Sequence, residues 1–320
     1  MKSFCSSGPA FIALLMFFGC AQKQHHPHQN IVWPDYGDLR KNVSLGSHVN
    51  NVPDVIGPVD GSAKLTILTE GNHYPILNSL VLGKFPEWCM SQKKCSVKKE
   101  EILLITLPQY MIVKGLKQGY FRFGNMVVPL EKSRVYPDIV MAGRKILDKL
   151  SNNDIIKKSS PINMIAKHKG MAILARKDSG ATSLSSAVRK KNRFVFASKI
   201  ETGARAQYLE SFSRILPEKK AKGLLRNEVQ FSERAYIQHR DVPYALLKNI
   251  ADIGFIFDHL ARFYAEVYSD RLIYIPIKQT DSLGKAIYWT RIENKNKSPL
   301  KFEEFFLSNY KKAYKDMIVE

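Results

Sequence analysis

The stretch that decides the fold is residues 64–85, KLTILTEGNHYPILNSLVLGKF. Its apolar start, residues 65–68, predicts a short buried strand, and the apolar residues after Pro75 recur at spacings of three and four, which predicts a helix. The polar corner at residues 70–73 leaves backbone N–H groups without helical partners, and such corners attract anions. For one corner alone, an ordinary strand-to-helix turn is the simpler interpretation, so the number of similar corners matters.

Two further strand-to-helix units follow. Residues 102–107 and 138–141 are apolar runs that predict strands, and each precedes a helical pattern. Three such units in a row predict a parallel sheet with helices on both faces. Ligands of such sheets bind beyond the carboxyl ends of the strands. Those ends are residues 69–73, 107–108 and 142–144.

The second half of the chain predicts another lobe. Residues 163–175 are long enough to form a strand that passes from one lobe into the other. Strands are predicted at 193–197 and 251–257, and extended segments at 272–277 and 285–292. The last helix places aromatic residues on one face, which predicts a core position for Phe302, Phe305, Phe306 and Tyr310.

The charge of the chain indicates anionic partners. Its 320 residues contain 49 Lys and Arg against 29 Asp and Glu, for a formal charge of +20. The basic runs are not interleaved with aromatic residues on one element, and no nucleic-acid-reading motif is present, so we expect no nucleic-acid partner. We interpret most of these runs as solvated surface.

The first twenty residues predict export. Lys2 is followed by an apolar stretch at residues 4–18, which is too short for a comfortable membrane span. The pair Gly19-Cys20 resembles the end of a bacterial lipoprotein signal, which implies a lipid on Cys20 and a membrane anchor. Ordinary cleavage or an uncleaved anchor remain alternatives. In each case we expect a periplasmic protein.

The next segment and the remaining cysteines complete this picture. Residues 21–61 are rich in polar residues, Pro and Gly, and predict a tether and lead-in segment. Cys89 and Cys95 are the two cysteines of the body, and in an oxidising compartment a disulfide between them is the simplest account. We expect no metal site and no cofactor.

Four segments carry a family resemblance: residues 65–85, 107–119, 138–150 and 237–255. The last is the most specific, with His239-Arg240 followed by Pro243 and then by Ala251-Asp252-Ile253-Gly254. In this order the segments resemble those of the periplasmic solute-binding proteins of ABC importers, and more closely the molybdate-binding and related extracellular oxyanion receptors.

The resemblance implies an α/β fold of the two-lobe periplasmic-binding-protein type II class. Each lobe would be a mostly parallel sheet flanked by helices, with a hinge between the lobes. Lobe I would comprise residues 62–164 and 281–320, and lobe II residues 165–280. The ligand would be held at strand ends and helix starts, by Gly71, Asn72, His73, Gly143, Arg144, Thr202, Gly203, His239, Arg240 and Asp258.

Glu70 and His73 depart from the family pattern, which commonly has Ser or Thr at these two places. A carboxylate that faces a dianion would repel it, so Glu70 either points away, pairs with an arginine, or indicates another cargo. Arg144 and Arg240 can each present a guanidinium fork to an oxyanion or carboxylate. The alternative for each arginine is to brace its own lobe through a neighbouring aspartate.

These observations predict a monomeric receptor that captures a small anion, molybdate-like or similar, and delivers it to the membrane subunits of an ABC importer. We predict that it is not an enzyme, because no nucleophile elbow, phosphate-binding glycine loop or metal-protease helix occurs in the sequence. The alternative is a binding-protein fold reused as an envelope docking protein with no transported cargo. A hydrolase or transferase built from scattered residues is a third, minor hypothesis.

Overall fold

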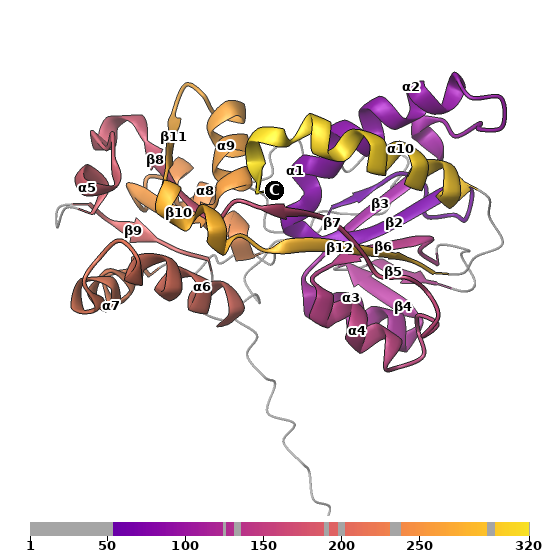
Figure 1. Ribbon diagram of the computed structural model, residues 1–320, viewed down its shortest axis with the longest axis horizontal. Coiled ribbons are helices and arrows are strands. Elements are labelled where there is room, and N and C mark those ends of the chain that lie inside the picture. Colours follow the sequence, from indigo (N-terminus) through magenta and orange to yellow (C-terminus); the bar gives the residue numbers. More distant parts are fainter. Residues whose placement is uncertain are drawn as a thin grey trace, which may run out of the picture.

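Two helix-flanked β-sheets form two lobes in the computed structural model (Figure 1). The structure describes residues 54–123, 126–130, 136–188, 192–197, 202–230, 238–292 and 298–319. The two-lobe α/β fold predicted from the sequence is confirmed. The predicted signal at 1–20, the predicted lipidation site Cys20 and most of the predicted tether lie outside the described residues.

The first lobe is built on a seven-stranded sheet with the strand order β1-β3-β2-β6-β12-β7-β13. Its strands are β1 (Val55–Ile56), β2 (Leu65–Glu70), β3 (Ile102–Leu107), β6 (Ile139–Ala142), β7 (Asn163–His168), β12 (Ala286–Arg291) and β13 (Ile318–Val319). Side chains alternate across β2, as the two-residue period of a strand requires. Leu65 and Ile67 pack in one core and Leu68 in the other, so helices are needed on both faces.

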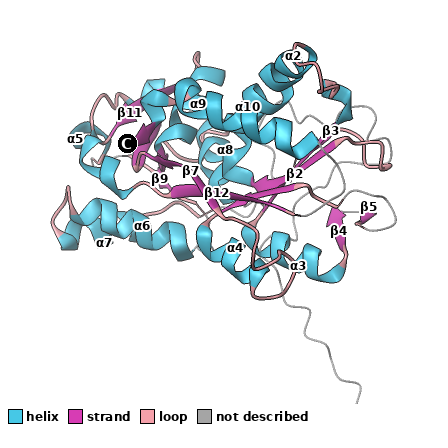
Figure 2. Ribbon diagram, turned by 45° about the vertical axis from the view of Figure 1, so that its right-hand side comes forward, coloured by secondary structure: helices cyan, strands magenta, loops and turns pink. Residues whose placement is uncertain are grey.

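Helices cover both faces of this sheet (Figure 2). One face packs against α1 (Tyr74–Leu77), η3 (Asn78–Lys84), α2 (Phe85–Met90) and α10 (Ser298–Ala313), and the other against α3 (Gln109–Gln118) and α4 (Arg144–Ser151). The hairpin of β4 (Tyr120–Phe123) and β5 (Met126–Pro129) follows α3, and η4 (Lys99–Glu101) and η8 (Lys315–Met317) are short turns. The predicted core stripe of α10 is confirmed, since its four aromatic residues are buried.

The second lobe has a four-stranded sheet with the order β11-β8-β10-β9. Its strands are β8 (Met171–Arg176), β9 (Phe194–Val195), β10 (Ile253–Phe257) and β11 (Leu272–Pro276). The helices are α5 (Leu184–Ala187), α6 (Thr202–Ser213), α7 (Glu218–Arg226), α8 (Asp241–Leu247) and α9 (Asp258–Val267), with turns η5 (Lys177–Ser179), η6 (Gln238–Arg240) and η7 (Lys278–Leu283). Phe255 is central to its core and contacts Phe212 with ring centroids 4.7 Å apart.

Both sheets are mixed, whereas the sequence predicted mostly parallel sheets. β2 pairs in parallel with β3 and β6, and β10 with β9; the other ladders are antiparallel. The predicted strand-to-helix units explain the parallel pairs, because a crossover helix returns the chain in the same direction. Apart from β1–β3, the antiparallel pairs of the two sheets include strands at which the chain changes lobes: β7 leaves the first sheet and β12 re-enters it beside β7, while β8 and β11 do the same in the second.

Two crossovers join the lobes and lie directly against each other. The first is Lys169-Gly170, which interrupts the single strand predicted over residues 163–175. The second runs from β11 through η7 to β12. A Cβ at Gly170 would meet the carbonyl oxygen of Thr280 at 2.0 Å, and one at Gly284 would meet that of His168 at 1.3 Å. Only glycine permits this close approach of two backbones.

The predicted disulfide is present. Cys89, at the end of α2, is bonded to Cys95 six residues later. The bond closes the loop that leads from the helical layer toward β3.

Candidate ligand-binding cleft

A buried carboxylate lies at the strand ends of the first lobe. Glu70 is the last residue of β2, and η2 (Gly71–His73) turns the chain from it into α1. Its Oε1 accepts a hydrogen bond from the backbone N–H of Gly143 at 2.6 Å, and its Oε2 accepts one from Gln109 Nε2 at 2.8 Å. Gly143 is the N-cap of α4, where unpartnered N–H groups attract negative charge. The chain's own carboxylate therefore occupies the helix start at which the sequence predicted a bound anion.

Two of the predicted ligand-binding residues interact locally instead. Arg144 Nε donates to Asp148 Oδ1 at 2.8 Å on the exposed side of α4. Asp258 begins α9 and accepts hydrogen bonds from Arg262 Nε at 2.8 Å and from the hydroxyl of Tyr274 at 2.6 Å. Neither residue lines the two hollows between the lobes that are described below.

Arg240 joins the two lobes through a buried ion pair. Its guanidinium lies 2.5 Å from Asp54 Oδ2, and the two side chains are 2% and 1% exposed. Asp54 precedes β1 at the edge of the first sheet, while Arg240 precedes α8 of the second lobe. Thr106 Oγ1 donates to Asp54 at 2.6 Å, and the Asp54 N–H donates to Thr106 Oγ1 at 2.9 Å. The structure thus gives Arg240 a bracing partner in the other lobe, whereas the sequence predicted bracing within its own lobe.

Four histidines meet where the lobes meet. His73, His168, His239 and His259 are all buried. The rings of His168 and His259 have centroids 4.6 Å apart. His259 Nε2 donates to the carbonyl oxygen of Asn72 at 3.2 Å, which is a direct contact from α9 of the second lobe to the corner after β2. The sequence predicted a binding role for His73 and His239 but did not predict this cluster.

Burial keeps these imidazoles neutral. It lowers the pKa of His73 and of His239 to about 3, that of His168 to about 2 and that of His259 to about 4, and proximity to His259 lowers the first three further. A neutral imidazole offers one donor and one acceptor. Because His259 Nε2 donates to a carbonyl, its Nδ1 is the acceptor, and this atom has no hydrogen-bond partner among the described residues.

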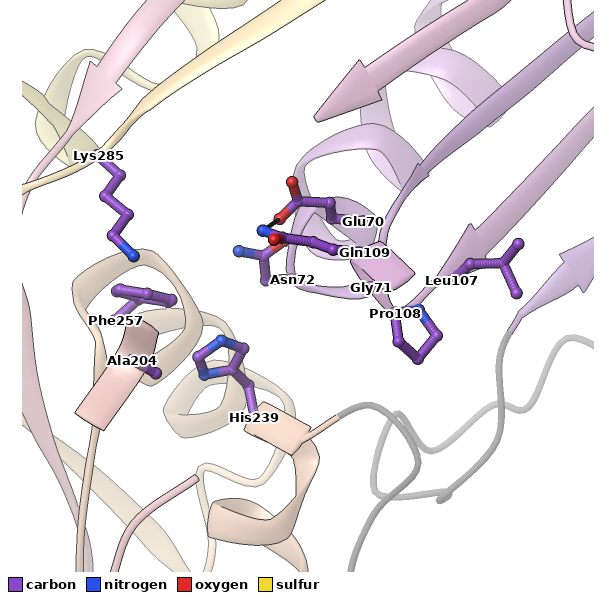
Figure 3. Close-up of a pocket in the computed structure, with 10 residues that line it drawn as sticks. All are labelled: Glu70, Gly71, Asn72, Leu107, Pro108, Gln109, Ala204, His239, Phe257 and Lys285. Atoms are coloured by element: carbon purple, nitrogen blue, oxygen red, sulfur yellow. Dashed lines mark hydrogen bonds between the residues drawn. The ribbon is translucent and has the colours of Figure 1, made fainter. Parts of the chain in front are cut away.

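The space between the lobes consists of two adjoining hollows of about 460 and 440 Å³, both open to solvent. Figure 3 shows Glu70 and Gln109 on one wall, with the ammonium of Lys285 pointing inward from the opposite side and Phe257 and His239 below it. The first hollow is lined by Glu70, Gly71, Asn72, Leu107, Pro108, Gln109, Ala204, His239, Phe257 and Lys285. The second shares five of these and adds His73, Gly143, His168, Lys169, His259, Ala286 and Ile287.

Several predicted site residues line these hollows, namely Gly71, Asn72, His73, Gly143 and His239. Thr202 and Gly203 begin α6, and the next residue, Ala204, is the one that lines the cleft. Sequence reasoning missed Gln109, Lys169, His259 and Lys285 as lining residues. Gln109 and His259 follow predicted strand ends, so their position in the sequence was sufficient to predict that they line the cleft. Lys169 and Lys285 lie on the crossovers, and no local sequence pattern indicates their role.

Two kinds of feature are absent from the described part of the chain. No group of three or more His, Cys, Asp or Glu side chains there is arranged to hold a metal ion, although four histidines are close. Within the same residues, no helix is both long and apolar enough to span a membrane.

Comparison with known proteins identifies the fold. No family model matches the sequence, and no curated protein matches it. A substrate-binding domain assigned to a molybdenum ABC transporter of Clostridium difficile matches with a TM-score of 0.52 and 15% identity, covering 80% of this chain and 99% of that one. The sulfate-binding protein SubI from Mycobacterium tuberculosis matches with a TM-score of 0.52 and 10% identity, covering 79% and 84%. The shared feature is the two-lobe fold of periplasmic solute-binding proteins.

Proposed function

We propose that this chain is an exported receptor that closes its lobes on a small solute with an anionic group and delivers it to an ABC importer. The observation that supports this most directly is the hollow between the lobes, lined by strand ends of one lobe and helix starts of the other beside two crossovers. Closure at a hinge would bury the solute and replace its water with protein groups. No bond is made or broken, in keeping with similar structures that are named as binding proteins.

In this proposal the anionic group of the solute binds next to Lys169 and Lys285. Lys169 and Lys285 line the hollow, while Arg144 and Arg240 have carboxylate partners elsewhere. A dianion of the molybdate type at the start of α4 would meet the carboxylate of Glu70, which already accepts the Gly143 N–H. Repulsion between like charges at such distances opposes this placement.

The remaining parts of the proposal concern the envelope. A lipid on Cys20 would hold the receptor at the membrane, residues 21–61 would act as the tether and lead-in segment, and the receptor would work as a monomer in the periplasm. Mass spectrometry of the protein purified from membranes tests the anchor, since a diacylated Cys20 at the new N-terminus has a mass that simple cleavage does not give.

A thermal-shift screen of the purified protein tests the receptor function. Small organic acids, amino compounds and inorganic oxyanions are added singly, and hits are titrated by calorimetry. A solute at 100 times its Kd stabilises the folded state by about 2.7 kcal/mol, which is several degrees in Tm. A decrease in the radius of gyration on binding, measured by small-angle X-ray scattering, would support closure. A screen without any shift would contradict the proposal.

A docking protein without cargo is the second candidate. It is favoured by the contacts that already join the lobes directly, the Arg240–Asp54 ion pair and the His259–Asn72 hydrogen bond. A receptor held closed by its own side chains has less to gain from a solute. No thermal shift with any solute, together with specific binding of one envelope protein, would favour this candidate.

A further inference from the structure

The two sides of the inter-lobe hollow differ in the groups they offer. Hydrogen-bond acceptors gather on the side of the corner after β2, where Glu70 and Asn72 lie. Ammonium groups come from the two crossovers, as Lys169 and Lys285. Figure 3 shows Lys285 and Glu70 on opposite sides of the space.

The acceptor side is more than one carboxylate. Asn72 Oδ1 and His259 Nδ1 are buried acceptors without a hydrogen-bond partner among the described residues. His259 is only 5% exposed, and its Nδ1 must accept because its Nε2 donates to a carbonyl. A buried acceptor without a partner is costly, so these atoms indicate a ligand with N–H donors. The Glu70 carboxylate would add the negative charge that selects a cationic donor.

The lysine side has the opposite character. Among the described residues, no carboxylate forms an ion pair with the ammonium of Lys169 or of Lys285, whereas ion pairs of other lysines and arginines are numerous. The charge of Lys169 acts on Asp281 of the second crossover without an ion pair, since it opposes the rise that burial causes in the Asp281 pKa. Lys285 is exposed and Lys169 is half-buried at the hinge. Both ammonium groups are therefore available to an acidic group of a ligand held between them and the first lobe.

An aromatic ring lies next to Lys285 on the wall of the cleft (Figure 3). Phe257, 6% exposed, lines both hollows, and its ring is stacked on His259 at 5.9 Å with an interplanar angle of 9°. Such a ring suits a short carbon chain and also favours a nearby cation through its π face.

We infer that the cargo is a small zwitterion, with an ammonium that faces Glu70, Asn72 and His259 and an acidic group that faces Lys169 and Lys285. The inference rests on the proposed receptor function and specifies its substrate class. The acid is a carboxylate, sulfonate or phosphonate, and the two charged groups are separated by a short carbon chain.

Matched probes test the inference on the unaltered protein. β-Alanine, taurine and 2-aminoethylphosphonate each have a counterpart without the amino group: propionate, ethanesulfonate and ethylphosphonate. We expect at least one amino compound to bind, and to bind about tenfold or more tightly than its counterpart, because the counterpart leaves buried acceptors unpaired. Molybdate and sulfate complete the panel.

Each outcome separates the two proposals. Binding of molybdate, sulfate or a deaminated counterpart at least as tightly as the amino compounds would overturn the zwitterion and leave the receptor in place. Absence of binding by every amino compound would also overturn it. If the wider solute screen then also gives no thermal shift, the result contradicts the proposed receptor function as well.

Two charge-neutral variants locate the two ends of the ligand. Glu70→Gln should lower the affinity for the amino probe about tenfold or more and leave the affinity for the deaminated probe no lower. Lys285→Gln should lower the affinity for both probes. The matched controls are Glu87→Gln on α2 and Lys114→Gln on α3, which are exposed and line neither hollow. Equal loss of both probes in Glu70→Gln would contradict the assigned orientation. Should Glu70→Gln fail to fold, the inference is still tested by Lys285→Gln, which changes an exposed residue, and by the matched probes on the unaltered protein.

Discussion

Four buried histidines make the stability of this protein depend on pH in the mildly acidic range. The pKa of each of His73, His168, His239 and His259 is lowered, from 6.5 to about 4 or below, chiefly by burial. In the unfolded chain these side chains take up protons as the pH falls through 6.5, whereas in the folded chain they remain neutral until about pH 4. The unfolded state therefore binds more protons, and the free energy of unfolding decreases as the pH falls.

The expected size of the effect follows from proton linkage. Well inside this window each histidine lowers the free energy of unfolding by about 1.4 kcal/mol per pH unit. Summed over four histidines from pH 7.5 to pH 5.5, the loss is about 5 kcal/mol. A typical domain has only about 5–15 kcal/mol in total, so the protein should be close to unfolding at the lower pH. The stabilisation is fully present above pH 6.5 and is lost below it.

Urea unfolding followed by circular dichroism at pH 7.5, 6.5 and 5.5 measures this dependence. We expect the urea midpoint to decrease steeply between pH 6.5 and 5.5. Replacing one histidine, as in His259→Gln, should remove about a quarter of the slope. A midpoint that stays constant over this range, or a slope unchanged in every single His→Gln variant, would refute the assignment of these histidines as buried and neutral.

Three further predictions concern the architecture, and urea unfolding or a thermal melt measures each. Gly284→Ala should destabilise the protein by about 1–3 kcal/mol, because the new Cβ meets a backbone carbonyl of the other crossover, whereas Gly223→Ala in α7, where space is open, should stabilise by about 0.5–1 kcal/mol. Arg240→Met should cost about 3–5 kcal/mol by leaving Asp54 charged and buried, and adding Asp54→Asn should recover part of it. Cys89→Ser should cost about 2 kcal/mol, and a reductant should reproduce that loss in the unaltered protein. A control variant as unstable as Gly284→Ala, no recovery in the double variant, or no effect of reductant would contradict the respective prediction.

The local elements could be predicted because they depend on periodicity. The strand at residues 102–107 was predicted with the bounds of β3, and the predicted helix at 75–85 lies within the helical run from α1 to α2. Strand direction could not be predicted in the same way. It depends on which strands become neighbours, and β12 comes to lie between β6 and β7 only because the chain returns from the second lobe.

The partners of the charged residues Glu70 and Arg240 also could not be predicted from the sequence. The sequence indicated that Glu70 departs from the pattern of the receptors it resembles, but the two donors of Glu70 lie 39 and 73 residues away along the chain. Arg240 pairs with a residue 186 positions earlier, within a segment predicted as tether and lead-in. Neither pairing leaves a local pattern, because the residues meet only when two sheets and two lobes are assembled.

The position of Glu70 connects these findings. A receptor for an inorganic dianion needs free N–H groups at its helix starts, and here the carboxylate of Glu70 accepts the Gly143 N–H at α4. The carboxylate of Glu70 therefore has two consequences for the cleft: the start of α4 needs no external anion, and the same wall attracts a cation. His259 favours the same outcome, because its neutral ring presents an unpartnered Nδ1 acceptor that takes an N–H donor without repelling it. The groups that line this cleft therefore support the proposed cargo, an acid that carries an amino group, over an inorganic dianion.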